Sequence, residues 1–135
     1  MTKPKKIINN PEESVDEFIK GLLLQYPNHL AKLANHHVVL KANIAHAPSQ
    51  VHLLSGGGSG HEPSHAGWIG DGMLSGAICG GIFASPSVSS ILAAIRAVKN
   101  EKGVLLVVKN VSFFLKKVSL EQKRYLLASF GTVIV

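Results

Sequence analysis

Apolar residues recur at helical spacing in two stretches of this chain. In residues 11–26 they are Val15, Phe18, Ile19, Leu22 and Tyr26, and in residues 85–98 they are Val88, Ile91, Leu92, Ile95 and Val98. A repeat near 3.6 residues places such side chains on one face of a helix, so we expect a helix in each stretch. Asn10 is positioned to cap the first helix, with Pro11 at its first position and Glu13 at capping-box spacing. The second helix is expected to begin at Ser85-Pro86.

Short apolar runs between these helices predict strands. They lie at residues 36–40, 51–54, 104–108 and 132–135, and a capping-box pattern predicts a third helix over residues 119–128. The run at 104–108 is apolar throughout, which is typical of a strand buried on both faces. Strands that alternate with helices favour an α/β fold with a mostly parallel sheet and flanking helices. Ligands of such sheets sit beyond the carboxyl ends of the strands.

The composition fits one domain, or part of one, that folds around a core. The chain has 135 residues, 46% hydrophobic and 16% charged, which excludes wholesale disorder. Its single cysteine, Cys79, excludes an internal disulfide framework and fits a reducing compartment. No apolar run reaches the roughly 20 residues of a membrane-spanning helix, and the basic start lacks the apolar segment of a signal peptide. We therefore expect a cytoplasmic protein with no membrane partner.

The net charge of +6 is concentrated towards the C-terminus. Residues 1–95 hold six lysines and six acids, which cancel, whereas residues 96–135 hold eight Lys or Arg against Glu101 and Glu121. A nucleic-acid-binding protein can concentrate charge in this way. However, the chain has no zinc-finger spacing, arginine-rich run or paired aromatic platform. A solvated surface with no nucleic-acid partner is the favoured interpretation.

Glycines concentrate in the middle of the chain. Residues 55–81 hold ten of the 13, and we expect a loop region there with short helical turns, since glycine adopts backbone shapes that other residues cannot. The densest part is SGGGSGHEP at residues 55–63. A strand that runs into such glycines lets backbone N–H groups converge on an anion or a polar ligand oxygen. A tight turn from strand to helix explains the glycines equally well.

Most named glycine-loop motifs do not fit this segment. A P-loop needs Lys and Ser or Thr after its last glycine, and the dinucleotide fingerprint and the nucleophile elbow both need glycine where His61 stands. Residues 61–65 do match the zinc-protease pattern H-E-x-x-H. That pattern requires a regular helix, and the turn residues before it, together with Pro63, argue against one. A zinc hydrolase is kept as a third and minor interpretation.

Two side chains near the expected sheet edge carry candidate chemistry. His61, at the end of the glycine loop, can donate a hydrogen bond to a ligand or act as a general acid or base, and it can equally serve only to order the loop. Lys109 follows the strand at 104–108 and can bring an ammonium group to the same edge. A lysine at a strand end is also commonly just solvated.

Five blocks of this sequence resemble the substrate-binding domain of dihydroxyacetone (glycerone) kinases. They are LLSGGGSGHEP at 53–63, GWIG at 67–70, GML at 72–74, FASP at 83–86 and LLVVKN at 105–110. The order, spacing and length of the blocks make the resemblance specific, and it covers about residues 5–110. Family members phosphorylate dihydroxyacetone, and often glyceraldehyde.

The resemblance implies which residues touch the substrate. The triose rests against the glycine loop, so Gly58, Ser59, Gly60 and His61 are expected to bind it, with Lys109 as a further contact. His61 is also expected to be the catalytic acid–base residue. The phosphate donor is ATP with Mg, held by a separate helical domain absent from this chain, or a phosphotransferase partner in some bacteria. We therefore expect no metal or cofactor bound by this chain itself.

The chain departs from the family after Asn110. The family continues there with an aromatic residue, Thr, Gly and an Asp base, and Phe114 stands in place of that Asp. A distal family histidine forms a covalent hemiaminal with the ketone carbon, and no histidine follows His65. We therefore divide the chain into residues 1–110, the N-terminal part of the substrate-binding domain, and 111–135, a divergent basic tail. The tail is either a true terminus or the translation of an intron or shifted frame.

Two functions follow from these departures. The first is a glycerone kinase substrate-binding module that is truncated and incomplete for catalysis. The second is a non-catalytic fragment that binds or regulates a full-length relative, and a homodimer is a further expected partnership. An incomplete domain leaves apolar surface and sheet edges uncovered, which would favour such pairing.

The purified 135-residue chain is expected to show no ATP-dependent phosphorylation of dihydroxyacetone. The reason is that Phe114 cannot accept a proton and that the family's covalent histidine has no counterpart here. A coupled assay for ADP release, with an intact family kinase as positive control, measures this. Turnover by the chain alone above the no-protein rate would contradict the expectation.

Overall fold

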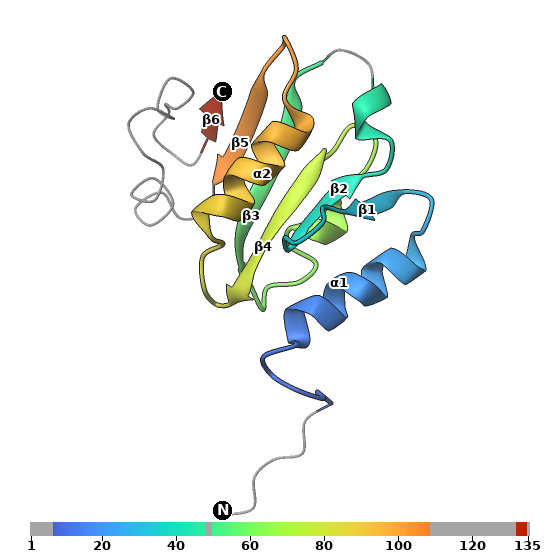
Figure 1. Ribbon diagram of the computed structural model, residues 1–135, viewed down its shortest axis with the longest axis vertical. Helices are drawn as coiled ribbons and strands as arrows, with labels where there is room; N and C mark the ends of the chain where they lie inside the picture. The colour runs from blue at the N-terminus through green and yellow to red at the C-terminus, as the bar shows by residue number, and fades with distance from the viewer. Residues whose placement is uncertain (1–6, 48–49, 109–131, 135) are drawn as a thin grey trace, which may run out of the picture.

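The structure, a computed structural model, describes residues 7–47, 50–108 and 132–134. Figure 1 shows one sheet packed between helices. The strands are β1 (Leu30–Lys32), β2 (Val38–Lys41), β3 (His52–Ser59), β4 (Gly76–Ile82), β5 (Val104–Val108) and β6 (Thr132–Ile134). The helices are α1 (Ser14–Gln25) and α2 (Val88–Val98), with 3-10 turns η1 (Ile44–His46) and η2 (Ala66–Trp68). Within the described ranges, no helix has the length and apolarity needed to cross a membrane.

The six strands lie in the order β1-β2-β4-β3-β5-β6. The central strands β4, β3 and β5 are parallel, whereas the β1–β2, β2–β4 and β5–β6 pairs are antiparallel. The expected α/β class with flanking helices is confirmed, and the sheet is mixed, with its parallel part at the centre. Residues 33–37 join β1 directly to β2, and so short a link permits only antiparallel pairing. In contrast, α2 lies in the chain between β4 and β5, two strands that both run parallel to β3.

Most strands lie where the apolar runs predict them. β2 and β3 begin within two residues of the predicted starts, and β5 spans the predicted residues 104–108. Residues 132–134 of the predicted run at 132–135 form β6, where Val133 pairs with Leu106 of β5. The helix expected over residues 119–128 lies outside the described residues.

The loop expected over residues 55–81 is wrong in two places, because β3 continues to Ser59 and β4 occupies Gly76–Ile82. Glycine is disfavoured in strands, so a composition this rich in glycine indicates a loop. The structure shows why glycine stands there all the same. A Cβ on Gly80 would overlap the carbonyl oxygen of Ala84, and one on Gly56 would lie 2.7 Å from that of Ile78. Backbone of the neighbouring strand at Gly56, and of the turn after β4 at Gly80, lies so close that a side chain would not fit.

Both helices begin later than the sequence predicts. Asn10 does not cap α1. Its side-chain oxygen accepts the N–H of Glu12 at 3.1 Å inside a turn, and the helix starts at Ser14. Helix α2 is capped by Ser87, whose hydroxyl oxygen accepts the N–H of Ser90 at 3.2 Å. The N-cap position of α1 is Glu13, with no side-chain cap hydrogen bond, so Asn10-Pro11 and Ser85-Pro86 each precede the observed N-cap.

Alternate residues of β4 are buried against different helices. Ile78 belongs to a cluster with Ile91 of α2, whereas Ala77 belongs to a cluster with Ile19 of α1. Successive side chains of a strand point to opposite faces, so α1 and α2 cover opposite faces of the sheet. The centre of the sheet is thus buried on both sides. Because both faces are covered there, the described part of the sheet centre remains open to a ligand only at the edges where its strands end.

Strand β5 is buried on one face among its described side chains. Val104 and Leu106 are each 1% exposed on the α2 side, whereas Val107 on the other face is 39% exposed. The prediction of two buried faces is therefore wrong at Val107. The reason is that α1 packs over β1 and β4, away from β5.

Gly80→Ala is expected to lower the free energy of unfolding by about 2 kcal/mol or more, because the new methyl group would meet backbone atoms that cannot rotate away. The matched control is Gly21→Ala within α1, where a Cβ meets nothing within 4 Å. This control is expected to raise stability by about 1 kcal/mol, since alanine is the better helix former. Urea unfolding followed by circular dichroism measures both, and equal stability of the two variants would contradict the packing argument.

Candidate functional site

The parallel strands end together at one edge of the sheet. Ser59, the last residue of β3, pairs with Ile82, the last of β4, and Val108, the last of β5, pairs with Gly56. In Figure 1 the arrowheads of β4 and β5 point to this lower edge. The chain leaves β3 here, so the loop residues predicted from the sequence gather at this edge. They are Gly58, Ser59, Gly60 and His61.

The end of β3 is held against the turn that follows β4. The Ser59 hydroxyl donates to the carbonyl oxygen of Gly80 at 2.9 Å, and the Phe83 N–H donates to the carbonyl oxygen of Ser59 at 2.8 Å. The turn lies so close that a Cβ on Gly58 would be 2.9 Å from the backbone nitrogen of Ala84. Ser59 is therefore buried and structural in its side chain, and any contact it makes with a ligand at this edge would come through its backbone.

The imidazole of His61 lies at the surface of this edge. His61 is exposed, and its ring meets the ring of Phe83 in a T-shaped contact with centroids 5.2 Å apart and an interplanar angle of 69°. An exposed imidazole can exchange a proton with a ligand or with water. The structure therefore leaves His61 accessible for the acid–base role that the sequence predicts.

The backbone amide of Gly60 faces a carboxylate. Its N–H donates to both oxygens of the Glu62 side chain, at 3.0 and 3.1 Å, and Gly60 has a φ of +106° that only glycine adopts without strain. The sequence analysis expected loop N–H groups to point at a bound anion or polar oxygen. The Gly60 N–H does not do so, because it already donates to Glu62. A carboxylate beside the loop repels anions, so this part of the site suits an uncharged polar ligand better.

Lys109 and Phe114 lie outside the described residues. Strand β5 ends at Val108 beside Gly56, one residue before Lys109 in the sequence. That Lys109 shares a hollow with His61 therefore stays a prediction. The same holds for the consequences of Phe114 standing where the family has an acid.

A hydrogen bond between the buried Ser55 and the half-buried His65 is a site feature that the sequence analysis did not assign. The Ser55 hydroxyl donates to the carbonyl oxygen of Val107 at 2.9 Å, and its oxygen lies 2.8 Å from Nδ1 of His65. A hydroxyl has one proton to donate, so Nδ1 of His65 is the donor to Ser55. This bond ties the segment after His61 back to β3 and β5. No local sequence signal marks it, because its partners are ten and 52 residues from Ser55.

The H-E-x-x-H segment is a turn in this structure. Residues 61–65 contain no α-helix, so His61 and His65 do not share a helix face as the zinc motif requires. Within the described ranges, no three His, Cys, Asp or Glu side chains come together in an arrangement that could hold a metal. The geometry here gives the zinc interpretation no support.

The cysteine beneath the loop is poorly suited to be a nucleophile. Cys79 pairs with Gly57 in the sheet and is buried. Burial, followed by the nearby negative charge of Glu62, raises the pKa of its thiol to about 11. Because the thiolate is the reactive form, this thiol stays inert at neutral pH.

A separate cavity of about 570 Å³ opens between α1 and the segment Pro63–Asp71. Its wall is largely apolar, with Leu22, Leu30 and Ile69 among the lining residues. Lys41 forms an ion pair with Asp71 at its rim, and the Lys41 hydrogen bond lowers the pKa of that carboxyl. The cavity shares Pro63 with the loop segment, but it includes none of the loop residues expected to bind substrate.

Comparison with known proteins gives one family. A family model described as the Dak1 domain matches residues 20–112. A Mus musculus protein named triokinase/FMN cyclase is 52% identical over 108 residues, which make up 78% of this chain and 18% of that protein. The dihydroxyacetone-binding subunit DhaK of the PTS-dependent dihydroxyacetone kinase of Lactococcus lactis is 42% identical over 106 residues, 78% of this chain and 31% of the subunit. The chain thus spans about a fifth to a third of these relatives.

Solved structures share the fold. The dihydroxyacetone kinase of C. freundii in complex with AMP-PNP and Mg2+ matches with a TM-score of 0.78 at 39% identity, over 89% of this chain and 23% of that one. The dihydroxyacetone kinase operon co-activator Dha-DhaQ matches with a TM-score of 0.67 at 40% identity, over 75% of this chain and 30% of that one. The likeness therefore extends to both the sequence and the fold.

Ser55→Ala is expected to lower the free energy of unfolding by about 1–3 kcal/mol, because His65 and Val107 both lose the hydroxyl that joins them. Lys20→Ala, at an exposed position of α1, serves as the control and is expected to change stability by less than about 0.5 kcal/mol. Urea unfolding gives both values. Equal effects in the two variants would show that the pair does not anchor the loop.

Proposed function

Since this chain belongs to the Dak1 domain family, we propose that it is a substrate-binding module of the glycerone kinase type, which binds dihydroxyacetone at the edge where β3 and β4 end. The single observation that carries the proposal is the loop Gly58–His61, held at that edge by Ser59 and closed by Phe83. The relative from Lactococcus lactis, a dihydroxyacetone-binding subunit by name, supports the choice of ligand. Glyceraldehyde is a second triose of the same size and polarity.

The charge pattern of the loop suits this ligand. Dihydroxyacetone is uncharged, and Glu62 already occupies the Gly60 amide with a negative group. An uncharged polyol avoids the repulsion that an anion would meet there. Its hydroxyl and carbonyl oxygens can take hydrogen bonds from the backbone at Gly58 and from the exposed imidazole of His61, and Lys109 is proposed as a further contact.

We assign the acid–base role to His61. It is the exposed titratable side chain at the end of the loop, and an imidazole transfers protons near neutral pH. The phosphate donor in this proposal is ATP with Mg, brought by a separate domain, and the chain itself binds neither. The structure of a related kinase with AMP-PNP and Mg2+ supports nucleotide use in the family. On this basis the chain acts in the cytoplasm, where such nucleotides are abundant.

The chain is proposed to consist of two parts. Residues 1–110 form the substrate-binding part and residues 111–135 a divergent basic tail. The match to the Dak1 domain over residues 20–112 supports a boundary close to residue 110. Catalysis by the chain alone is not part of the proposal, because Phe114 replaces the family's acid.

A second candidate is a non-catalytic regulator that pairs with a full-length relative or with another copy. The observation that favours it is the likeness to Dha-DhaQ, which is a kinase operon co-activator by name. Exposed apolar side chains add to it, since Leu24 is 82% and Val107 is 39% exposed. Size-exclusion chromatography with and without a full-length kinase separates the candidates. A chain that elutes as a monomer, both alone and with the kinase, would contradict the regulator.

Dihydroxyacetone added to the 15N-labelled chain is expected to shift the amide signals of Gly58 and Gly60 in a saturable manner. His61→Ala is expected to weaken binding about tenfold, which corresponds to one lost hydrogen bond. His46→Ala, at an exposed position of η1, is the matched control and should bind as the unaltered chain does. An unaltered chain whose loop amides do not respond would end the proposal.

A further inference from the structure

Phe83 has an unusual backbone and an unusual exposure for its residue type. Its φ is +50°, in the left-handed region, and its side chain is 70% exposed. The other described residues with positive φ that are not glycine are Asn35 and Asn43. Asparagine tolerates this region and phenylalanine does so poorly. An exposed aromatic side chain in a strained conformation needs a reason other than folding, and such strain commonly collects at functional sites.

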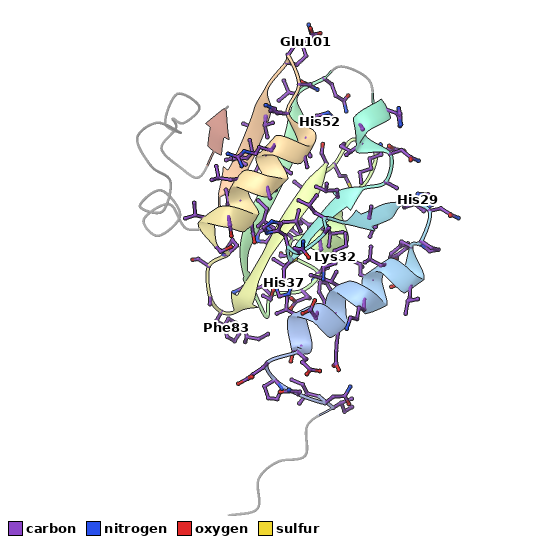
Figure 2. The ribbon with its side chains drawn as sticks, in the orientation of Figure 1. His29, Lys32, His37, His52, Phe83 and Glu101 are labelled. Atoms are coloured by element: carbon purple, nitrogen blue, oxygen red, sulfur yellow. The ribbon has the colours of Figure 1, made fainter. Side chains whose placement is uncertain are left out.

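The surroundings of Phe83 hold it in place despite the strain. Its N–H donates to the carbonyl oxygen of Ser59 at 2.8 Å, and the N–H of Ala84 donates to that of Gly81 at 3.0 Å. The turn therefore has its backbone fixed from both sides. Figure 2 shows Phe83 at the end of the sheet where β4 finishes.

The ring of Phe83 lies directly on the glycine loop. A Cβ on Gly60 would be 2.9 Å from Cζ of the ring, so glycine at position 60 makes room for it. Beside this contact, the ring meets the imidazole of His61 at a centroid distance of 5.2 Å and an angle of 69°. Edge-to-face contacts of this kind are the preferred geometry for two aromatic rings. The ring thus touches two of the loop residues assigned to the substrate.

We propose that Phe83 positions the imidazole of His61 and forms an apolar wall of the substrate site. An imidazole on an exposed loop turns freely about its side-chain torsions, and a neighbouring ring restricts it to the orientation in which it can reach the ligand. The wall also excludes water from one side of the bound molecule and limits the site to a small polyhydroxy ketone or aldehyde with a C–H surface to offer. The positioning role stands on the geometry alone, whereas the wall rests on the proposed binding of dihydroxyacetone.

The positioning role can be tested without a ligand. In the full 135-residue chain, Phe83→Gly is expected to move the 13C–1H signal of the His61 ring, because the ring-current effect of the neighbour is lost. Phe83→Tyr keeps the ring and should restore the signal. Ile82→Ala, a neighbouring position that is 47% exposed, is the control and should leave the signal in place.

Thermal stability separates this role from a structural one. Phe83→Gly is expected to leave the melting temperature unchanged or to raise it, since glycine adopts a φ of +50° without strain. A structural role predicts a lower melting temperature. A His61 signal that stays fixed in Phe83→Gly, or a clear fall in melting temperature with it, would overturn the proposal.

Binding of dihydroxyacetone tests the wall. Phe83→Gly is expected to weaken binding about fivefold or more, with Phe83→Tyr and Ile82→Ala close to the unaltered chain. If the unaltered chain binds dihydroxyacetone and Phe83→Gly binds it with the same affinity, the proposed wall role of Phe83 is wrong. If the unaltered chain itself does not bind dihydroxyacetone, the proposed function fails and the wall fails with it, while the His61 signal still decides the positioning role.

Discussion

The close approach of backbone segments at the carboxyl edge of the sheet is the constraint on which the rest of this structure depends. β3, β4 and the turn after β4 come so near to one another that a Cβ on Gly56, Gly58 or Gly80 would lie within 3.0 Å of a backbone atom. Backbone atoms cannot rotate out of the way as a side chain can, so glycine is required at these positions by contact and not by turn geometry. The same contacts bring Ser59 against Gly80 and fix the direction in which the loop leaves the sheet.

The sequence pattern predicts the elements whose side chains carry the burial. The two amphipathic helices and the apolar strand β5 follow from periodicity, and the structure confirms them with shifted ends at α1 and α2. Strand β4 does not follow from it. β4 is stabilised by its place in the sheet, between β2 and β3. The intrinsic preference of Gly80 and Gly81 opposes a strand. A single sequence does not reveal that β2 and β3, on either side of β4, override this preference.

Some features of the candidate site can likewise be predicted from the sequence, and others cannot. The loop Gly58–His61 is predictable because glycines before a histidine form a local pattern. The Ser55–His65 bond and the contact of Phe83 with His61 are not, since each joins residues that are distant or unmarked in the sequence. Phe83 illustrates the difficulty, because neither its strained φ nor its exposure can be recognised before the fold is known. Lys109 and Phe114 fall outside the described residues, so their roles remain predictions from the sequence.

Charge and shape at the edge together narrow what the loop can accept. A glycine-rich strand end is usually an anion site, because its N–H groups are free to point at the ligand. Here Glu62 accepts the Gly60 N–H and brings a negative charge of its own, while the ring of Phe83 lies against the same glycine. An incoming anion would have to displace a carboxylate that is two residues away and cannot diffuse off. A small uncharged molecule meets no such charge repulsion, so this glycine-rich strand end favours a neutral polar ligand over an anion.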